Sequence, residues 1–327
     1  MNLGRLAALG LLLSAAPAAR AADLGPKLAL PIACKIGETC EIQNYVDRDP
    51  GPGASDYRCG HRTYEGHGGV DIRILDMAAQ RRGVDVLAAA PGRVARLRDG
   101  VADISIRAAN APSVEDHKCG NGVVIDHGGG WETQYCHLAR GSVKVKVGDQ
   151  VVAGQPLAHV GLSGMTEFPH LHLSVRHGTI GVDPFAPTPG AGCAAQPSMW
   201  TPAAAKATSY KAGAILNAGF ADHALTADEL EAGGLPRPGQ TAPWLVAYGR
   251  AIGLQKGDVM ELTLTAPDGA VLAADKRPPL AADRAVEFRL VGKRRPGQAW
   301  PAGTYRAVYR VLRDGSVAMT RNFAITF

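Results

Sequence analysis

Two histidines separated by one residue, His170 and His172, are the first candidates for chemistry in this sequence. Apolar residues alternate with them at Leu171, Leu173 and Val175, the period-two pattern of a β-strand with one buried face. Because successive side chains of a strand point to opposite faces, both imidazoles should project from the other face. A single His-x-His is typical of an exposed strand, so the functional interpretation depends on donors elsewhere in the chain.

A second set of donors lies in the segment 66–71, where three residues separate His67 from Asp71. In a straight strand these two side chains would lie about 13 Å apart. Gly68 and Gly69 between them permit a tight bend that brings both donors to one point. Two imidazoles and one carboxylate form a common zinc site, with a fourth position open for water.

The segment Tyr135-Cys136-His137-Leu138 supplies another histidine. In a regular strand His137 and Tyr135 share a face and Cys136 points away, so Cys136 is a better disulfide partner than ligand. The sequence contains no His-Glu-x-x-His motif, and the glutamate base of many metalloproteases is therefore absent. Histidine has an unperturbed pKa near 7, so we expect a histidine to act as the base.

Five motifs in this order resemble the lysostaphin/LytM-type zinc endopeptidases of bacterial cell walls. They cover about residues 61–187 and comprise His67-x-x-x-Asp71, the segments 121–128, 133–138 and 147–155, and Pro169-His170-Leu171-His172. The resemblance implies that His67, Asp71 and His172 bind one zinc ion per chain. It also implies that His137 and His170 are the two further active-site histidines. Local pattern alone does not distinguish His170 from His172 as the ligand.

The resemblance further implies a metalloendopeptidase that hydrolyses peptide cross-links or stem peptides of peptidoglycan. Zinc would polarise the scissile carbonyl, and His137 and His170 would transfer protons; which of them is the base stays open. The alternatives are a non-catalytic LytM-type activator of a cell-wall amidase and a wall-binding module. The activator is marked by a missing zinc ligand, and the five-residue set here is complete.

Residues 1–21 have the pattern of a secretory signal peptide, with Arg5, an apolar stretch over 6–13 and Ala19-Arg20-Ala21 at the cleavage site. The apolar stretch is shorter than the roughly 20 residues needed to span a bilayer. We therefore expect a periplasmic or secreted protein without a stable membrane anchor. Cleavage would leave 33 basic and 30 acidic residues, a mild excess that favours peptidoglycan and no nucleic-acid partner. The oligomeric state is not indicated.

Six cysteines in an exported chain predict three disulfides. Cys34 and Cys40 are close enough in sequence to close a local loop, whereas the pairing of the other four stays open. These are Cys59, Cys119, Cys136 and Cys193.

The pattern of short strands divided by Gly and Asp predicts an all-β protein. We expect a cysteine-containing N-terminal extension over 22–60, a lysostaphin-type β-sheet domain over 61–190, a linker over 191–210 and an immunoglobulin/fibronectin-like β-sandwich over 211–327. Strands are expected at 104–106 and 143–145, among others, and no helix within 61–187. In the C-terminal part, a capping box at Thr226 and Glu229, with Gly233-Gly234 as the stop, predicts one short helix. The aromatic residues Trp244, Trp300, Tyr305 and Tyr309 are expected in the sandwich core.

Overall fold

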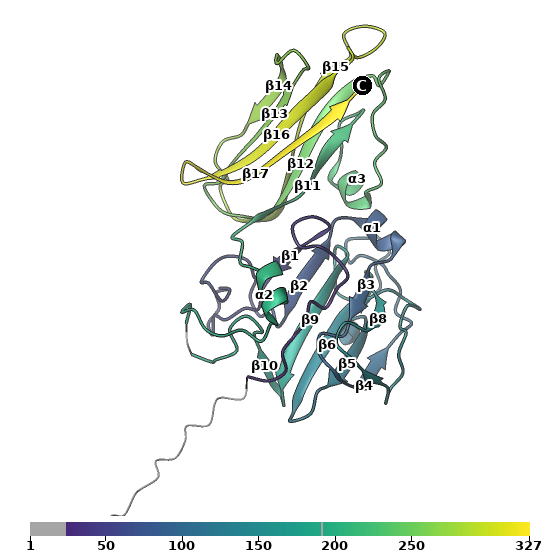
Figure 1. The fold of residues 1–327 in the computed structure, drawn as a ribbon, viewed down its shortest axis with the longest axis vertical. Coiled ribbons are helices and arrows are strands. Elements are labelled where there is room, and N and C mark those ends of the chain that lie inside the picture. Colours follow the sequence, from purple (N-terminus) through teal and green to yellow (C-terminus); the bar gives the residue numbers. More distant parts are fainter. Residues whose placement is uncertain (1–23, 191) are drawn as a thin grey trace, which may run out of the picture.

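The computed structural model describes residues 24–190 and 192–327, so the expected signal peptide lies outside the described residues. Figure 1 shows two parts along the long axis, one around a large sheet and one around two smaller sheets. The α-helices are short: α1 (Met77–Arg82), α2 (Pro202–Ala207) and α3 (Ala227–Ala232). The all-β prediction is confirmed. Within the described ranges, no helix has the length and apolar character needed to cross a membrane.

The large sheet is antiparallel and has the strand order β1-β2-β9-β6-β5-β4-β7, with β10 pairing on β9. Its strands are β1 (Cys40–Asn44), β2 (Val70–Ile74), β4 (Gly92–Arg98), β5 (Asn121–Asp126), β6 (Trp131–Leu138), β7 (Gln150–Val151), β9 (His170–His177) and β10 (Ile180–Val182). A separate pair comprises β3 (Asp85–Leu87) and β8 (Pro156–His159). Leu171, Leu173 and Val175 lie in the core, as the alternation predicts. The order places β2, β9 and β6 side by side, and these strands carry the histidine and aspartate motifs.

Several local predictions in this part were wrong. Residues 104–106 and 143–145 are loop segments rather than strands. The helix α1 was missed because six residues are too few for a helical period to emerge. Its N-cap is Asp76, whose side chain accepts a hydrogen bond from the N–H of Ala79 at 2.8 Å. The extension also supplies β1, which forms one edge of the large sheet.

The C-terminal part is a sandwich of two antiparallel sheets. One contains β11 (Ala214–Ala221), β12 (Trp244–Leu254) and β15 (Arg284–Arg294); the other contains β14 (Val271–Lys276), β13 (Val259–Thr265), β16 (Thr304–Arg313) and β17 (Ser316–Thr326). One apolar cluster with residues from both sheets fills the space between them. It includes Trp300, Tyr305 and Tyr309, as predicted, whereas Trp244 at the start of β12 is 43% exposed and lies outside that core.

The predicted capping box is present at the start of α3. The Thr226 hydroxyl accepts from the N–H of Glu229 at 3.2 Å, and the Glu229 carboxylate accepts from the N–H of Thr226 at 2.8 Å. The helix ends at Ala232 and has Gly233 as its C-cap, where the sequence predicts the stop. This helix lies at the junction with the large-sheet part, close to α1 (Figure 1).

Three disulfides join the six cysteines: Cys34–Cys40, Cys59–Cys193 and Cys119–Cys136. The predicted local bridge is confirmed, and the described residues contain no free cysteine. Three disulfides fit an oxidising, extracytoplasmic compartment.

We expect native protein, denatured without reductant, to contain no reactive thiol, and reduction to lower the melting temperature. Loss of one native bridge typically costs about 2–5 kcal/mol of stability. Thiol titration and a melting curve in the presence and absence of reductant measure both effects. Two or more reactive thiols in the unreduced protein would contradict this pairing.

Asp183, which directly follows β10, is a buried carboxylate with a pH-dependent effect on stability. Burial raises its pKa from 3.8 to about 6, despite a hydrogen bond from the N–H of Phe185 and Arg48 at 3.6 Å. Because the folded pKa is the higher one, the folded state binds this proton more tightly than the unfolded chain does. The contribution of Asp183 to stability therefore falls as the pH rises from about 4 to about 6.

We expect Asp183→Asn to remove this fall. Relative to wild type, the variant should gain up to about 3 kcal/mol in free energy of unfolding between pH 4 and pH 7. Urea unfolding of both proteins at the two pH values measures the change, because the titration of all other groups cancels in the difference. A difference that stays constant with pH would contradict the assignment.

Candidate metal centre

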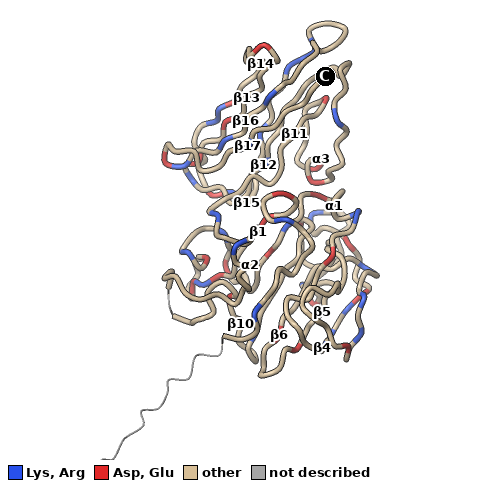
Figure 2. The backbone as a smooth tube through the Cα atoms, viewed as in Figure 1, with Lys and Arg blue, Asp and Glu red and all other residues tan. Residues whose placement is uncertain are grey.

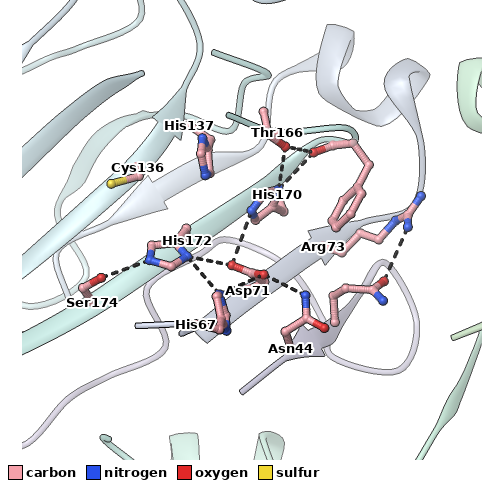
Figure 3. A network of polar contacts seen from close by, with 12 residues as sticks. Asn44, His67, Asp71, Arg73, Cys136, His137, Thr166, His170, His172 and Ser174 are labelled. Carbon is pink, nitrogen blue, oxygen red and sulfur yellow. Dashed lines mark hydrogen bonds and ion pairs between the residues drawn. The ribbon is translucent and has the colours of Figure 1, made fainter. Parts of the chain in front are cut away.

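The strand order brings four histidines and one aspartate to one place on the large sheet (Figure 3). Asp71 on β2 and Cys136 on β6 both pair with His172 on the intervening β9. His67 lies on the loop that enters β2, and its Nε2 is 3.1 Å from Oδ2 of Asp71. The chain therefore bends as predicted, and Gly69 lies against the site. A Cβ atom there would be 2.5 Å from Nε2 of His172, so a glycine is required.

The atoms of His67, Asp71 and His172 that face one another have the spacing of metal donors. Nε2 of His67 is 3.3 Å from Nδ1 of His172, which is 2.8 Å from Oδ1 of Asp71. Two donors of a tetrahedral zinc site with bonds of about 2.0–2.1 Å are about 3.3 Å apart. A second group, His137, His170 and His172, also has donor atoms close enough to share a metal ion. Both groups include His172.

Hydrogen bonds to neighbouring groups orient the three donors. Nδ1 of His67 donates to the carbonyl oxygen of Tyr45 at 2.6 Å, which leaves the lone pair of Nε2 for the site. Nε2 of His172 lies 3.0 Å from the hydroxyl of Ser174, so Nδ1 is the nitrogen that faces Asp71. The side-chain amide of Asn44 donates to Oδ2 of Asp71 at 2.9 Å. Such contacts fix the tautomer and ring orientation of metal ligands.

The remaining two histidines present their Nε2 atoms in the same way. Nδ1 of His137 donates to the carbonyl oxygen of Ser163 at 2.8 Å, and Nδ1 of His170 donates to that of Phe168 at 2.9 Å. A carbonyl oxygen only accepts, so each Nδ1 carries a proton, and a neutral ring of this tautomer has its lone pair on Nε2. Nε2 of His170 is 3.4 Å from Oδ1 of Asp71. The two imidazoles lie beside each other, with ring centroids 4.6 Å apart.

The backbone at His137 departs from the regular strand that the sequence predicts. Its φ is +61°, a left-handed conformation that is uncommon for residues other than glycine. The side chain therefore leaves the alternation: His137 faces the site, whereas Tyr135 is fully buried in the core. The prediction that these two residues share a face was wrong, and the prediction that Cys136 forms a disulfide is confirmed.

Burial and mutual electrostatic interactions shift the pKa values of three residues in this cluster. Burial alone would raise the pKa of Asp71, but His170 and His67 outweigh it and hold the pKa well below its usual range. Burial would lower the pKa of His67, and the Asp71 carboxylate reverses the direction and raises it. Burial and the neighbouring His170 and His172 hold the pKa of His137 well below 6.5. Asp71 is thus ionised and His137 neutral near pH 7.

Residues 65–184, which contain all five of these residues, match the model of peptidase family M23. This segment is an M23 peptidase domain. The resemblance inferred from the motifs is therefore confirmed. A stretch of 58 residues is 41% identical to the cell division protein DipM of Caulobacter vibrioides. That match covers 18% of this chain and 9% of DipM, so the chain spans about a tenth of this relative.

Two solved structures are examples of the structural similarity. A zinc-containing peptidase from Vibrio cholerae is 26% identical, with 43% of this chain and 38% of that chain covered and a TM-score of 0.28. The catalytic domain of lysostaphin from Staphylococcus simulans is 22% identical, with 43% and 85% covered and a TM-score of 0.28.

The donor set of the M23 domain fits zinc by its chemistry, because two imidazoles and one carboxylate are ligands that zinc commonly takes. Sequence reasoning missed the groups that orient these donors and His137, namely Asn44, Ser174 and the carbonyls of Tyr45 and Ser163. Ser174 follows His172 by two residues and shares its strand face, so the alternation could have identified it. The other three come from distant segments and carry no local signal.

Proposed function

We propose that this protein is a zinc-dependent endopeptidase that hydrolyses peptide cross-links or stem peptides of bacterial peptidoglycan. In this proposal His67, Asp71 and His172 hold one zinc ion per chain. The observation that carries the proposal is the pair of imidazoles, His137 and His170, whose Nδ1 atoms are bonded to backbone carbonyls and whose rings lie beside this donor set. A purely structural zinc site is closed by four protein ligands and does not need two additional imidazoles.

The side chains divide the work of peptide hydrolysis. Zinc, when bound, would supply Lewis-acid chemistry that polarises the scissile carbonyl and acidifies water. Either His137 or His170 can accept the proton of the attacking water at Nε2, and the other can hydrogen-bond the developing oxyanion or protonate the leaving amine. The backbone carbonyls that accept from each Nδ1–H hold both rings in the tautomer that this step requires.

We also propose where the protein acts and which domain carries out hydrolysis. An exported enzyme with three disulfides meets peptidoglycan in the periplasm or outside the cell. We assign hydrolysis to the domain predicted over 61–190, and we propose no ligand in the extension over 22–60, the linker over 191–210 or the sandwich over 211–327. The similarity to a cell division protein supports a role in wall remodelling.

Incubation of the protein with purified, cross-linked sacculi tests the proposal. We expect new amino termini to appear, to disappear after chelation, and to return when zinc is added back. A parallel reaction contains a cell-wall amidase. Stimulation of the amidase by zinc-loaded protein that releases no amino terminus by itself would favour the activator, and binding without either effect would favour the wall-binding module.

A further inference from the structure

Arg73 is a charged residue in a fully buried position beside the candidate metal centre. It follows Asp71 by two residues on β2, so both lie on the same strand face, and its backbone pairs with His170 on β9. Its side chain is 2% exposed. A guanidinium that is removed from water needs a counter-charge, because an unpaired buried charge is strongly unfavourable.

The counter-charge comes from the C-terminal sandwich. Oε2 of Glu231, in α3, accepts hydrogen bonds from Arg73 and, at 2.8 Å, from Arg250 on β12. Arg250 also donates to the carbonyl oxygen of Leu75, which directly follows β2. Among the described residues, Arg73 forms an ion pair with no other carboxylate. Figure 2 shows the acidic residues of α3 beside the basic end of α1 at this junction.

A chain of contacts leads from Arg73 to the candidate catalytic imidazole (Figure 3). The Cζ atom of Arg73 lies 4.2 Å from the ring centroid of Phe168, within cation–π distance. The Phe168 ring is 4.8 Å from the His170 ring, and its carbonyl oxygen accepts the Nδ1–H of His170 at 2.9 Å. Phe168 therefore contacts His170 through both its side chain and its backbone.

We propose that Glu231 is a positioning residue for His170. The carboxylate holds the Arg73 guanidinium on the Phe168 ring, and Phe168 in turn holds the imidazole with Nε2 toward Asp71. The sandwich thus supports the active site without contributing a ligand or touching the substrate. This inference rests on the proposed function for its effect on turnover, whereas the orientation of the imidazole can be measured without any activity.

The test compares full-length, zinc-loaded wild type with Glu231→Ala. We expect unchanged zinc content, an unchanged KM and a kcat lowered about 5- to 50-fold on a small soluble cross-linked muropeptide, because small displacements of a reacting group can cost up to about 10²-fold. In ¹⁵N-histidine NMR spectra, we expect the Nδ1–H signal of His170, assigned with His170→Ala, to broaden or disappear. That Nδ1 atom lies 2.9 Å from the Phe168 carbonyl oxygen and 3.1 Å from the Thr166 hydroxyl, so the signal reports how the ring is held there.

The conservative variant Glu231→Gln separates the effect of the hydrogen bonds of this side chain from the effect of its negative charge. Oε1 of Glu231 has no hydrogen-bond partner among the described residues, so an amide can place its oxygen at Oε2 and its NH₂ group at Oε1. We expect this variant to be less stable than wild type, because two buried guanidinium groups lose their counter-charge. It should nevertheless keep most of the turnover and the His170 Nδ1–H signal.

Leu262→Ala is the matched control for stability, because Leu262 is fully buried in the sandwich core. It should lower the melting temperature without a change in kcat or in the His170 signal. Phe168→Leu tests the path, since it removes the aromatic ring and leaves the Glu231 ion pairs intact. If Glu231 acts through Phe168, the double variant with Glu231→Ala loses much less than the product of the two single effects.

A folded Glu231→Ala protein with wild-type kcat and His170 signal would overturn the proposal. A change in KM alone would overturn it as well, since the junction would then bind substrate. If Leu262→Ala lowers kcat as much as Glu231→Ala does for the same loss of melting temperature, the effect of Glu231 is one of stability alone and the proposal is overturned. If wild type cleaves nothing, the proposed function fails, and the NMR signals still test whether Glu231 positions His170.

Discussion

Replacing Asp71 or His67 by alanine should abolish stoichiometric zinc binding. Each substitution removes one of the three proposed donors, whose contacting atoms lie 2.8–3.3 Å apart. Loss of a group that only orients a ligand typically costs 10- to 100-fold in metal affinity, and loss of a ligand itself should cost more. We therefore expect one zinc per wild-type chain and less than about one tenth of that in either variant after dialysis.

Elemental analysis of the dialysed proteins measures this effect, with circular dichroism to verify folding. The sandwich offers a matched control, because His223 and Asp222 form an exposed pair at 2.7 Å. His223→Ala and Asp222→Ala should retain one zinc per chain. Full zinc occupancy in both Asp71→Ala and His67→Ala would show that the ligand assignment is wrong.

Replacing His137 by alanine should preserve zinc binding and reduce turnover about 10²- to 10⁴-fold, the usual contribution of a general acid–base group. Nε2 of His137 faces the site while its Nδ1 is bonded to the carbonyl of Ser163, so the ring is placed to transfer a proton. Steady-state hydrolysis of a soluble muropeptide, combined with zinc analysis of the same samples, separates the two effects. His177→Ala is a suitable control, because His177 stacks on Trp131 at the far end of β9.

The outcome of His137→Ala also discriminates between the two overlapping donor groups. If His137 were a ligand together with His170 and His172, the variant would lose zinc as well as activity. Retention of both zinc and full turnover would instead remove His137 from the chemistry.

The sequence predicts the components of the site because each motif lies on its own short segment. The alternation around His170 and His172 identifies a strand with one buried face, and the glycines between His67 and Asp71 predict the bend. The position of His137 depends on one left-handed backbone angle at the end of β6, and such an angle has no signature in a histidine. The orienting role of Asn44 was equally hidden, because it depends on the pairing of β1 with β2.

Long-range contacts explain what else was missed. The ion pair between Arg73 and Glu231 joins residues 158 positions apart, and no periodicity or turn motif links them. Features that depend only on neighbouring residues were predicted correctly. The capping box of α3 lies within four residues, and it was predicted together with the stop at Gly233. The prediction for Trp244 was wrong because it used residue type alone. Tryptophan is usually well buried, but Trp244 lies at the start of a strand and is exposed to solvent.

The most direct test of the account is the digestion of defined, cross-linked muropeptide dimers by zinc-loaded wild type, with identification of the products by mass spectrometry. We predict products that each gain one water at a peptide bond of the cross-link or stem, with intact glycan, and formation of the same products about 10²- to 10⁴-fold more slowly with His137→Ala. Dimers that remain uncut by the metal-loaded protein, while the same preparation stimulates a cell-wall amidase, would contradict the account.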